Sequence, residues 1–451
     1  MSGEWFGEIP RHWESEKIGA LFTERRMKVS DKDYPPLSVA KIGVVPQLET
    51  AVKTDAGDNR KLVCKGDFVI NSRSDRKGSC GVSKLDGSVS LINIVLTPRG
   101  QLSGGYTHYL LRSQPFAEEY YRNGRGIVSD LWTTRYSEMK SILLPVPPRE
   151  EQEQIVRFLD WKVSAINRLI ANNRHKIELL ESMKRRIIDR AVIKGVTNVP
   201  IVHNDDMRWP IDYPKHWKIQ RLKEYFAFRK GLSITKADLE ETGIAVISYG
   251  QVHSKSNSGF GLNPNLIRYV NESYLATNKS SLVTKGDFIF ADTSEDIAGC
   301  GNCAYIDWDD TIFAGYHSII AHPATPINSP YLAYLFQSQT WRWQIHKKVN
   351  GVKVYSITQS MLKDTFILLP PVEGQKEIVA YLEKTCKRID EAVEKTNDKI
   401  KMLQELKPRL ISDVVTGKID VHGVEVPEFA SVEEETCEES VLEEEEADEQ
   451  A

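Results

Sequence analysis

Two Lys-Gly-Asp-Phe tetrapeptides are the first candidates for chemistry in this sequence. Their carboxylates, Asp67 and Asp287, recur at an offset of 220, and each precedes a Phe and a second apolar residue. A recurring carboxylate of this kind could serve in catalysis. The same pattern describes a turn that enters a strand, in which glycine relieves the backbone and aspartate caps it. We favour the structural interpretation for both residues.

A cysteine pair is the second candidate. Cys300-Gly-Asn-Cys303 has the spacing of half a zinc site, whereas a structural zinc usually needs four ligands. No second Cys-x-x-Cys follows, and Cys80-Gly81 repeats only Cys300-Gly301, again at an offset of 220. A turn with small buried thiols is the favoured interpretation, and we expect no metal site.

Motifs for nucleotide or methyl-donor chemistry are missing. The sequence contains no GxxxxGK[ST] and no glycine-rich fingerprint for a nucleotide or adenosyl cofactor. Asn263-Pro264 continues as Asn265-Leu266, which favours a surface turn over an amino-methyltransferase site. His12-Trp13 and His216-Trp217 have the character of packed anchors rather than proton-transfer pairs. We expect no catalytic residue and no cofactor in this chain.

Basic and aromatic residues in loops are more informative, because arginine forks suit guanine edges and phosphates. The Ser/Gly-rich loop between Asn71 and Gly81 is cationic, whereas its counterpart at 291–301 is acidic and the cations of that half lie elsewhere. A solvated surface remains the alternative for any single residue. The candidate DNA-binding residues are Arg73, Arg76, Lys77, Arg125, Trp132, Arg135, Lys255, Asn257, Lys347, Lys348 and Lys353.

The elements that must position these loops include two copies of one long helix. PPREEQEQIVRFLD (147–160) recurs as PPVEGQKEIVAYLE (370–383), at an offset of 223. Apolar residues then step by four and three from Ile155 and, in parallel, from Ile378. A period of 3.5 residues predicts a narrow helical seam, and its obvious partner is the other copy. Pro408, late in the second copy, is expected to kink the helix or end it early.

Polar residues interrupt the predicted seam at matching places. Asn173 aligns with Thr396, and Lys184 aligns with Lys407. Such positions cost stability but can determine register and orientation. The residues that we assign to helix pairing are Ile166, Ile170, Asn173, Ile177, Leu180, Ile389, Val393, Thr396, Ile400 and Leu403.

The duplication extends beyond the helices. IPRHW (9–13) returns as YPKHW (213–217), and YLLRSQPF (109–116) returns as YLFQSQTW (334–341). The halves therefore share one ancestral unit with loops of unequal length, in which recognition tends to reside. Each half is interpreted as mixed α/β. Strands are expected within 62–70, 88–96, 245–249 and 281–290, and helices at 106–121 and 330–345.

Length and composition are those of a globular protein. The 451 residues suggest about three domains, with 41% hydrophobic and 27% charged residues. No apolar run approaches the ~20 residues of a membrane span, and no signal peptide is recognised. Six scattered cysteines indicate a reducing, cytoplasmic setting. Residues 428–451 contain twelve acidic and no basic residues, so the body carries +8 while the whole chain carries −4.

Two variable domains, each followed by a repeated helix that opens with PPxxxxQxxI, resemble the specificity subunit of type I restriction–modification enzymes. The telling residues are Pro147-Pro148, Gln152 and Ile155 and their counterparts in the second helix, and the resemblance covers essentially residues 1–427. The acidic tail, and Gly374 where the first helix has Glu151, depart from the usual pattern.

The resemblance implies an α+β fold with a pseudo-twofold internal repeat: two similar mixed α/β target recognition domains, joined and spaced by two long antiparallel, coiled-coil-like helices. The expected divisions are domain 1 at 1–148, the first helix at 149–198, domain 2 at 199–372, the second helix at 373–420 and an acidic disordered tail at 421–451.

The function implied by the resemblance is DNA sequence recognition. Each domain would read one half of a split double-stranded DNA target, and the helices would set the spacing. The helix-pairing residues would also dock two methyltransferase subunits, which bind S-adenosylmethionine. ATP-driven nuclease–translocase subunits, with Mg, would join that core.

Two rival functions remain open on the sequence. A methyltransferase or nuclease acting alone is disfavoured by the missing cofactor motifs. A coiled-coil scaffold whose variable domains bind protein would lack the salt-dependent, sequence-selective DNA binding of a reader.

Overall fold

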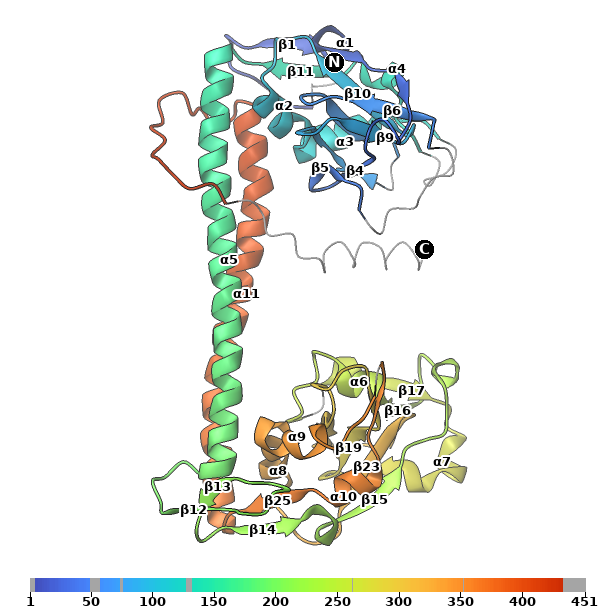
Figure 1. The fold of residues 1–451 in the computed structure, drawn as a ribbon, viewed down its shortest axis with the longest axis vertical. Coiled ribbons are helices and arrows are strands. Elements are labelled where there is room, and N and C mark those ends of the chain that lie inside the picture. The colour runs from blue at the N-terminus through green and yellow to red at the C-terminus, as the bar shows by residue number, and fades with distance from the viewer. Residues whose placement is uncertain are drawn as a thin grey trace. The chain divides into compact units, whose positions relative to one another are not determined.

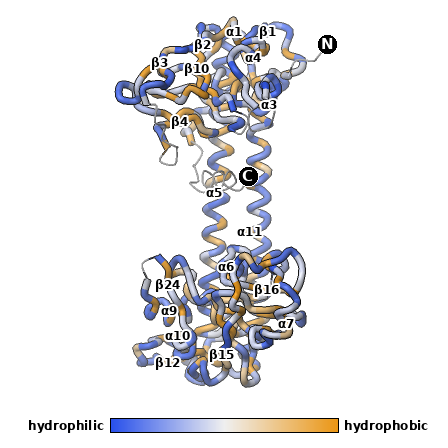
Figure 2. Tube along the Cα trace, turned by 90° about the vertical axis from the view of Figure 1, so that its right-hand side faces the viewer, coloured by the Kyte–Doolittle hydropathy of each residue, from blue (hydrophilic) through white to orange (hydrophobic). Residues whose placement is uncertain are grey.

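The computed structural model describes residues 5–48, 57–73, 76–126, 132–261, 263–351 and 353–432. The chain divides into two compact units (Figure 1). The first comprises Met1–His175 and Thr396–Ala451, and the second comprises Lys176–Lys395. Figure 2 shows hydrophobic segments gathered within each unit, whereas the long helices are largely hydrophilic.

The first unit is built on a four-stranded antiparallel sheet in the order β2-β10-β7-β8. A three-stranded sheet β3-β6-β9 and the pairs β1-β11 and β4-β5 complete it. Its elements are β1 (Glu14–Lys17), α1 (Ile18–Leu21), β2 (Phe22–Glu24), β3 (Lys28–Val29), β4 (Leu37–Ala40), β5 (Gly43–Pro46), β6 (Arg60–Val63), β7 (Phe68–Asn71), β8 (Cys80–Val82), β9 (Gly87–Val89), β10 (Asn93–Pro98), α2 (Gly104–Leu111), α3 (Gln114–Arg122), α4 (Tyr136–Met139) and β11 (Leu143–Val146).

The second unit repeats this plan with the sheet β15-β23-β19-β21 and the pair β14-β25. Its sheet β17-β16-β22-β18 has β18 and β22 in the places of β6 and β9. Its elements are β12 (Ile201–His203), β13 (Asp212–Pro214), β14 (Lys218–Arg221), β15 (Phe226–Lys230), β16 (Ile244–Ile247), α6 (Tyr249–His253), β17 (Arg268–Val270), α7 (Tyr274–Thr277), β18 (Leu282–Val283), β19 (Phe288–Ala291), β20 (Thr293–Ser294), β21 (Cys303–Tyr305), β22 (Ile312–Ala314), β23 (Ser318–Pro323), α8 (Ser329–Gln337), α9 (Gln339–His346), β24 (Tyr355–Ser356), α10 (Gln359–Lys363) and β25 (Phe366–Leu369).

Two long helices, α5 (Arg149–Lys194) and α11 (Val372–Val415), follow the two domains. In the first unit Lys407 Nζ lies 3.3 Å from Asn167 Oδ1. In the second, Lys184 Nζ lies 2.6 Å from Asp390 Oδ1. At the offset of 223, Lys184 is equivalent to Lys407 and Asn167 is equivalent to Asp390. The two contacts therefore join the same pair of equivalent positions, once in each unit. From residue 167 to residue 184 of α5, the contacted residue of α11 moves back from 407 to 390, so the helices pair antiparallel, as expected.

Each domain also binds the end of the other repeat's helix. In the first unit the Tyr106 hydroxyl donates to the carbonyl of Val415, at the end of α11 (2.9 Å). In the second unit the Tyr331 hydroxyl donates to the carbonyl of Val192, near the end of α5 (3.1 Å). Both tyrosines are buried. These reciprocal contacts confirm the predicted fold class with its pseudo-twofold repeat.

The two His-Trp motifs are packed anchors, as predicted. Trp13 and Trp217 are buried. A Cβ on Gly417, which has φ +74°, would lie 3.1 Å from Trp13, and one on Gly195, which has φ +80°, would lie 3.1 Å from Trp217. Both glycines follow the C-terminus of a long helix, where a left-handed residue ends the helix and leaves room for the indole.

Two helix predictions need correction. The segments 106–121 and 330–345 each form two helices, broken at Ser113 and Ser338. Each serine hydroxyl donates to the carbonyl three residues earlier, at 2.7 Å in both units. A serine that bonds to the backbone in this way favours a helix boundary over a helix interior.

Of the two effects expected of Pro408, an early end of α11 is not observed. The helix continues through Pro408 to Val415 and does not end early. Leu410, Ile411, Val414 and Val415 pack with the core of the first unit. This burial offsets the hydrogen bond that proline cannot make.

Part of the predicted disordered tail is ordered. Between 421 and 432 the chain follows α5 in the first unit: Gln154 Nε2 donates to the carbonyl of Val424 (2.6 Å) and Asn167 Nδ2 to that of Val432 (3.1 Å). Val421 is buried in the same core. The remainder of the predicted tail, 433–451, lies outside the described residues.

Candidate nucleic-acid interface

The repeated Lys-Gly-Asp carboxylates are structural, as predicted. Asp67 accepts hydrogen bonds from the Cys64 amide (2.8 Å), Arg25 Nε (2.8 Å) and the Thr97 hydroxyl (3.0 Å). The side-chain hydrogen bond to Asp67 raises the pKa of Arg25. The buried carboxylate thus ties its turn to two neighbouring strands.

The second copy of this turn is built in the same way. Asp287 accepts from the Thr284 amide at 3.0 Å and lies 2.7 Å from His322 Nδ1. Its carboxylate is also buried, and Arg229 lies 3.5 Å from it. Both aspartates are therefore buried turn residues that accept hydrogen bonds from their own turn and from neighbouring strands.

The two cysteines of the Cys-x-x-Cys motif are buried in the core of the second unit. Burial raises the pKa of the Cys303 thiol to about 12, which disfavours the thiolate that metals prefer. Within the described ranges, no three His, Cys, Asp or Glu side chains gather as a metal site would require. Strand register corrects one alignment: Ile70 pairs with Cys80 and its counterpart Phe290 pairs with Cys303, so Cys303, not Cys300, corresponds to Cys80.

Three loop segments meet at one edge of the first unit. Thr133 forms backbone bridges with both Arg73 and Arg125. The Thr134 amide donates to the carbonyl of Ser72 (2.9 Å), and the Ser72 amide donates to that of Ile92 (3.3 Å). The described residues of the loop after β7, of the turn before β10 and of the segments 125–126 and 132–135 thus form one surface, which we call the tip of the domain.

The structure brings several predicted DNA-binding residues to this tip. Arg73, Arg76 and Lys77 are exposed on the loop after β7, and Arg125 and Arg135 are exposed on the segment that bridges to it. Arg125 also lies 3.9 Å from Glu138. Trp132 is different: it is half-buried, and its indole nitrogen donates to the carbonyl of Tyr121 at 2.7 Å. It therefore supports the tip more than it extends from it.

The second unit has an equivalent tip. The pair β20-β24 places Thr293 opposite Ser356, in the positions of Arg73 and Thr133. The Asp292 amide donates to the carbonyl of His317 (3.0 Å), which corresponds to the Ser72–Ile92 bond of the first unit. The two repeats thus share the backbone scaffold of the tip, whereas the side chains that it carries differ.

Predicted residues of the second unit lie in two places. Lys353 is exposed just before β24, and Lys255 is exposed after α6. Asn257 organises its own loop, because its amide donates to the carbonyls of Val252 (2.8 Å) and Cys303 (3.1 Å). Lys347 donates to the carbonyl of Met207 (2.9 Å), and Lys348, beside it, is half-buried. The latter two follow α9 rather than the tip.

The turns before β10 and β23 contribute tip residues that were not predicted from the sequence. Leu91 and Ile92 in the first unit are 40% and 43% exposed, and the second unit has Tyr316 and His317 in their place. The feature of the sequence that could have identified these residues is a pair of large side chains at the turn between two apolar strands.

The helix-pairing residues are buried or half-buried along α5 and α11. Ile166, Ile170, Ile389 and Thr396 are buried, and the other predicted members are partly covered: Asn173, Ile177, Leu180, Val393, Ile400 and Leu403. Asn173 donates to the carbonyl of Leu169 one turn earlier (2.7 Å).

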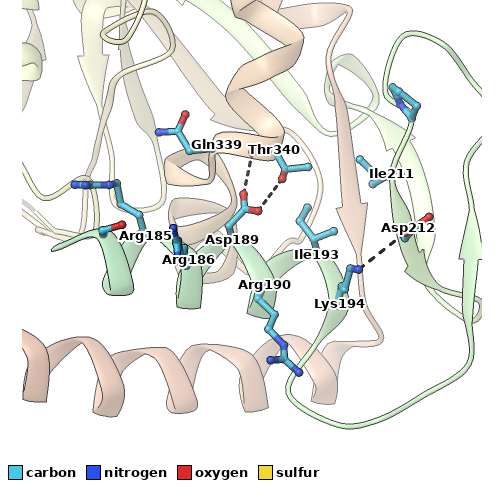
Figure 3. Close-up of a pocket in the computed structure, with 12 residues that line it drawn as sticks. Arg185, Arg186, Asp189, Arg190, Ile193, Lys194, Ile211, Asp212, Gln339 and Thr340 are labelled. Atoms are coloured by element: carbon cyan, nitrogen blue, oxygen red, sulfur yellow. Dashed lines mark hydrogen bonds and ion pairs between the residues drawn. The ribbon is translucent and has the colours of Figure 1, made fainter. Parts of the chain in front are cut away.

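A basic groove of about 810 Å³ lies in the second unit between the last turns of α5, the start of α9 and β13 (Figure 3). Arg185, Arg186, Arg190 and Lys194 line it. Asp189 is engaged with the start of α9, since it accepts from the Thr340 amide and hydroxyl, each at 2.8 Å. Among the described residues, Arg186 and Arg190 make no ion pair.

The basic residues of the groove are only partly repeated on α11. Position 186 corresponds to Arg409, whereas position 190 corresponds to Asp413, which lies 3.8 Å from Arg409 and 3.9 Å from Lys418. The guanidinium groups of the groove suit a carboxylate or a phosphate. None of the described helices is both long and apolar enough to cross a membrane.

Comparison with known proteins agrees with this architecture. Residues 214–402 match the family model of the type I restriction modification DNA specificity domain. The type I restriction enzyme MjaVIII specificity subunit of Methanocaldococcus jannaschii is 24% identical over 289 residues, or 63% of this chain and 64% of that subunit. The putative MjaX specificity subunit of the same organism is 22% identical, covering 92% of this chain and 95% of that one.

Solved structures share the fold. A chain from a study of complex assembly and conformational transition of the type I R-M system superposes with a TM-score of 0.67 at 14% identity, covering 91% of this chain and all of that one. The HsdS subunit from Thermoanaerobacter tengcongensis gives a TM-score of 0.51 at 18% identity over 91% of this chain and 98% of that subunit. The resemblance expected from the sequence is therefore confirmed.

Proposed function

We propose that this chain, a relative of the type I specificity subunits with a DNA specificity domain at residues 214–402, reads a split DNA sequence for a restriction–modification complex. Each domain binds one half of a double-stranded target. The two halves of the target differ, because the two tips differ.

The observation that carries this proposal is the repeated tip. The same backbone contacts recur in both units, Ser72 to Ile92 and Asp292 to His317, while the exposed side chains around them change. A scaffold that is retained while its exposed loops diverge is suited to two related readers with different targets. In the first unit five exposed cations at the tip supply charge for phosphates and guanine edges.

The long helices act as spacer and docking surface in this proposal. Dimeric DNA-binding proteins place two reading elements at a separation that matches two half-sites, and a pseudo-twofold chain can do the same for unlike half-sites. The reciprocal contacts of Lys184 and Lys407 support a defined helix register. The exposed faces of α5 and α11 then bind two methyltransferase subunits, to which nuclease–translocase subunits add.

Chemistry belongs to the partners in this proposal. The methyltransferase subunits supply S-adenosylmethionine, and the nuclease–translocase subunits supply ATP and Mg. This chain contributes no catalytic residue and acts inside the cell, in the cytoplasm.

The test is methylation of a random-sequence DNA library by this chain co-expressed with a methyltransferase subunit encoded beside it. We expect modified sites to share two short, unlike motifs around a constant gap. Methylation without sequence preference, or methylation unchanged when this chain is omitted, would instead favour the protein-binding scaffold.

A further inference from the structure

The turn between β22 and β23 in the second unit has an unusual backbone. His317 has φ 53°, and it is the one residue other than glycine with positive φ in the described ranges. Histidine, asparagine and aspartate occupy this region more often than other L-residues do. Non-glycine residues in such conformations cluster at functional sites, where the surrounding structure holds them.

Three backbone hydrogen bonds hold this turn. The Gly315 amide donates to the carbonyl of Ile247 (2.7 Å), the Tyr249 amide donates to that of Tyr316 (3.3 Å), and the Asp292 amide donates to that of His317 (3.0 Å). The turn is thus a rigid support and not a free loop, which is what a reading element needs.

Four rings meet at the turn, and two of them, those of Tyr316 and His317, belong to the turn itself. Tyr249 makes edge contacts with Tyr316 (centroids 5.5 Å apart), His317 (5.4 Å) and His253 (6.3 Å). The imidazole of His317 remains 56% exposed, and its Nδ1 lies 3.2 Å from the Asp292 carboxylate. Its Nε2 makes no hydrogen bond to any described residue.

The partner of Nδ1 determines what Nε2 can do. A carboxylate only accepts hydrogen bonds, so Nδ1 carries the proton in the neutral ring and Nε2 is left as an acceptor. An exposed acceptor at the tip of a DNA-reading domain matches the amino groups that adenine and cytosine present in the major groove.

The equivalent turn of the first unit supports a reading role. Its residues, Leu91 and Ile92, are exposed on the same backbone support and carry only apolar groups. Apolar side chains contact the methyl group of thymine, whereas an imidazole acceptor contacts an amino group. The same position in the two repeats therefore offers different chemistry to DNA.

We propose that His317 contacts the exocyclic amino group of one adenine or cytosine in the half-site read by the second unit, with Tyr249 and Tyr316 holding its ring. This inference rests on the proposed function of the chain and names a specificity-determining residue within it. The acidic loop 291–301, which lacks the arginines of its counterpart, supplies Asp292 as the group that orients the imidazole.

The test replaces His317 by Gly, which accommodates positive φ and removes the imidazole acceptor, and sequences the sites methylated by the co-expressed complex. Asn would not serve, because its side-chain carbonyl can accept a hydrogen bond from the same amino group. We expect the preference at one adenine or cytosine position of one half-site to fall by roughly 2- to 10-fold, as for the loss of one hydrogen bond. The other half-site and the gap should not change. H216G is the matched control, since His216 is exposed in the same unit and lies outside the tip.

The first half-site serves as an internal control for folding and assembly. Should H317G fail to assemble, H317A, which also removes the acceptor, is used in the same assay. Unchanged preference at both half-sites would overturn the role of His317, and so would an equal loss at both, or a lost guanine or thymine preference. A wild-type complex without any sequence preference would overturn the proposed function itself, which separates the two failures.

Discussion

At the scale of single residues, repetition in the sequence reports architecture more often than chemistry. Asp67 and Asp287 recur because each fastens a turn to two strands, with partners that also recur: Arg25 and Arg229, and Thr97 and His322. The residues that we assign to recognition do the opposite. They occupy equivalent backbone positions and differ in side chain.

Asp67 should therefore matter for stability. Asp67→Ala leaves Arg25 and the Cys64 amide without their acceptor, and we expect the free energy of unfolding of the first unit to fall by about 2–4 kcal/mol. Urea denaturation, with amide hydrogen exchange in β7 to localise the change, measures this. Asp33→Ala, at an exposed carboxylate, is the control. Unaltered stability with lost DNA recognition would assign Asp67 a functional role instead.

His108 should make the first unit sensitive to acid. Burial, with Arg112 beside it, lowers the pKa of His108 to about 4, compared with 6.5 for an unperturbed histidine. Between these two pH values the unfolded chain binds a proton at His108 and the folded unit does not. The free energy of unfolding therefore falls as the pH decreases from about 6.5 to about 4, by up to about 3 kcal/mol. Hydrogen exchange of α2 amides at pH 7 and pH 5 follows the loss. In His108→Gln this part of the pH dependence should disappear.

At the scale of elements, the paired helices are defined by a few contacts inside each unit. Lys184 and Asp390 are equivalent to Lys407 and Asn167, so one repeat uses an ion pair where the other uses a neutral amide. The polar positions lie where the sequence interrupts the apolar seam, and they give the pairing a register that apolar side chains alone leave loosely specified.

Exchange of the two charges tests this register. Lys184→Glu should destabilise the helix pair of the second unit by about 1 kcal/mol, and adding Asp390→Lys should restore most of the loss. The coupling energy from the double-mutant cycle, measured by thermal unfolding, is the readout. A coupling energy of zero would mean that the contact does not contribute to the register.

Helix length should set the spacing between half-sites. Inserting seven residues at matched positions of α5 and α11 adds about 10 Å of helix, or about three base pairs at ~3.4 Å each. We expect the gap in the methylated sequence to lengthen accordingly, with both half-sites retained. A gap that stays constant in the insertion variant would rule out the spacer role.

At the scale of the whole molecule, the chain combines a basic body with an acidic C-terminal run. Residues 433–451 contain eleven acidic and no basic residues, so deleting them changes the net charge from −4 to +7. The ordered segment before them, 421–432, is part of the first unit because it packs along α5 and buries Val421. The two parts of the predicted tail should therefore behave differently when removed.

Two truncations separate these parts. Deletion after Val432 should leave the thermal unfolding unchanged but strengthen non-specific DNA binding, because it removes negative charge that repels DNA. The effect should be largest at low salt, where the repulsion is screened least. Deletion after Asp420 should also destabilise the first unit, because Gln154 loses its carbonyl partners. Fluorescence anisotropy at several salt concentrations and thermal unfolding report the two effects. Equal DNA affinity of the full chain and the shorter truncation would contradict the first expectation.

Much of the architecture could be derived from the sequence. The helices recur at a constant offset of 223, and other segments recur at similar offsets. These repeats predicted two like domains, each followed by one helix, because segments with the same pattern of apolar residues adopt the same fold. The helix seam and the Lys-Gly-Asp turns followed from local periodicity and turn chemistry. Two features did not follow from local patterns. The helix breaks at Ser113 and Ser338 depend on a hydrogen bond from the serine hydroxyl to the backbone, and the continuation of α11 through Pro408 depends on the burial of its last turns.

The composition of the tips could not be derived in this way. Arg73 is far from Arg125 and Thr133 in the chain, and the three residues meet through backbone bridges at Thr133 that no local pattern predicts. Tyr249, His253 and His317 assemble for the same reason. That the chain is duplicated, with two unlike sets of loops, is visible in its order of residues, because the repeated segments stand in the sequence itself. Which side chains meet at each tip depends on pairing between distant segments, and the folded chain alone establishes that pairing.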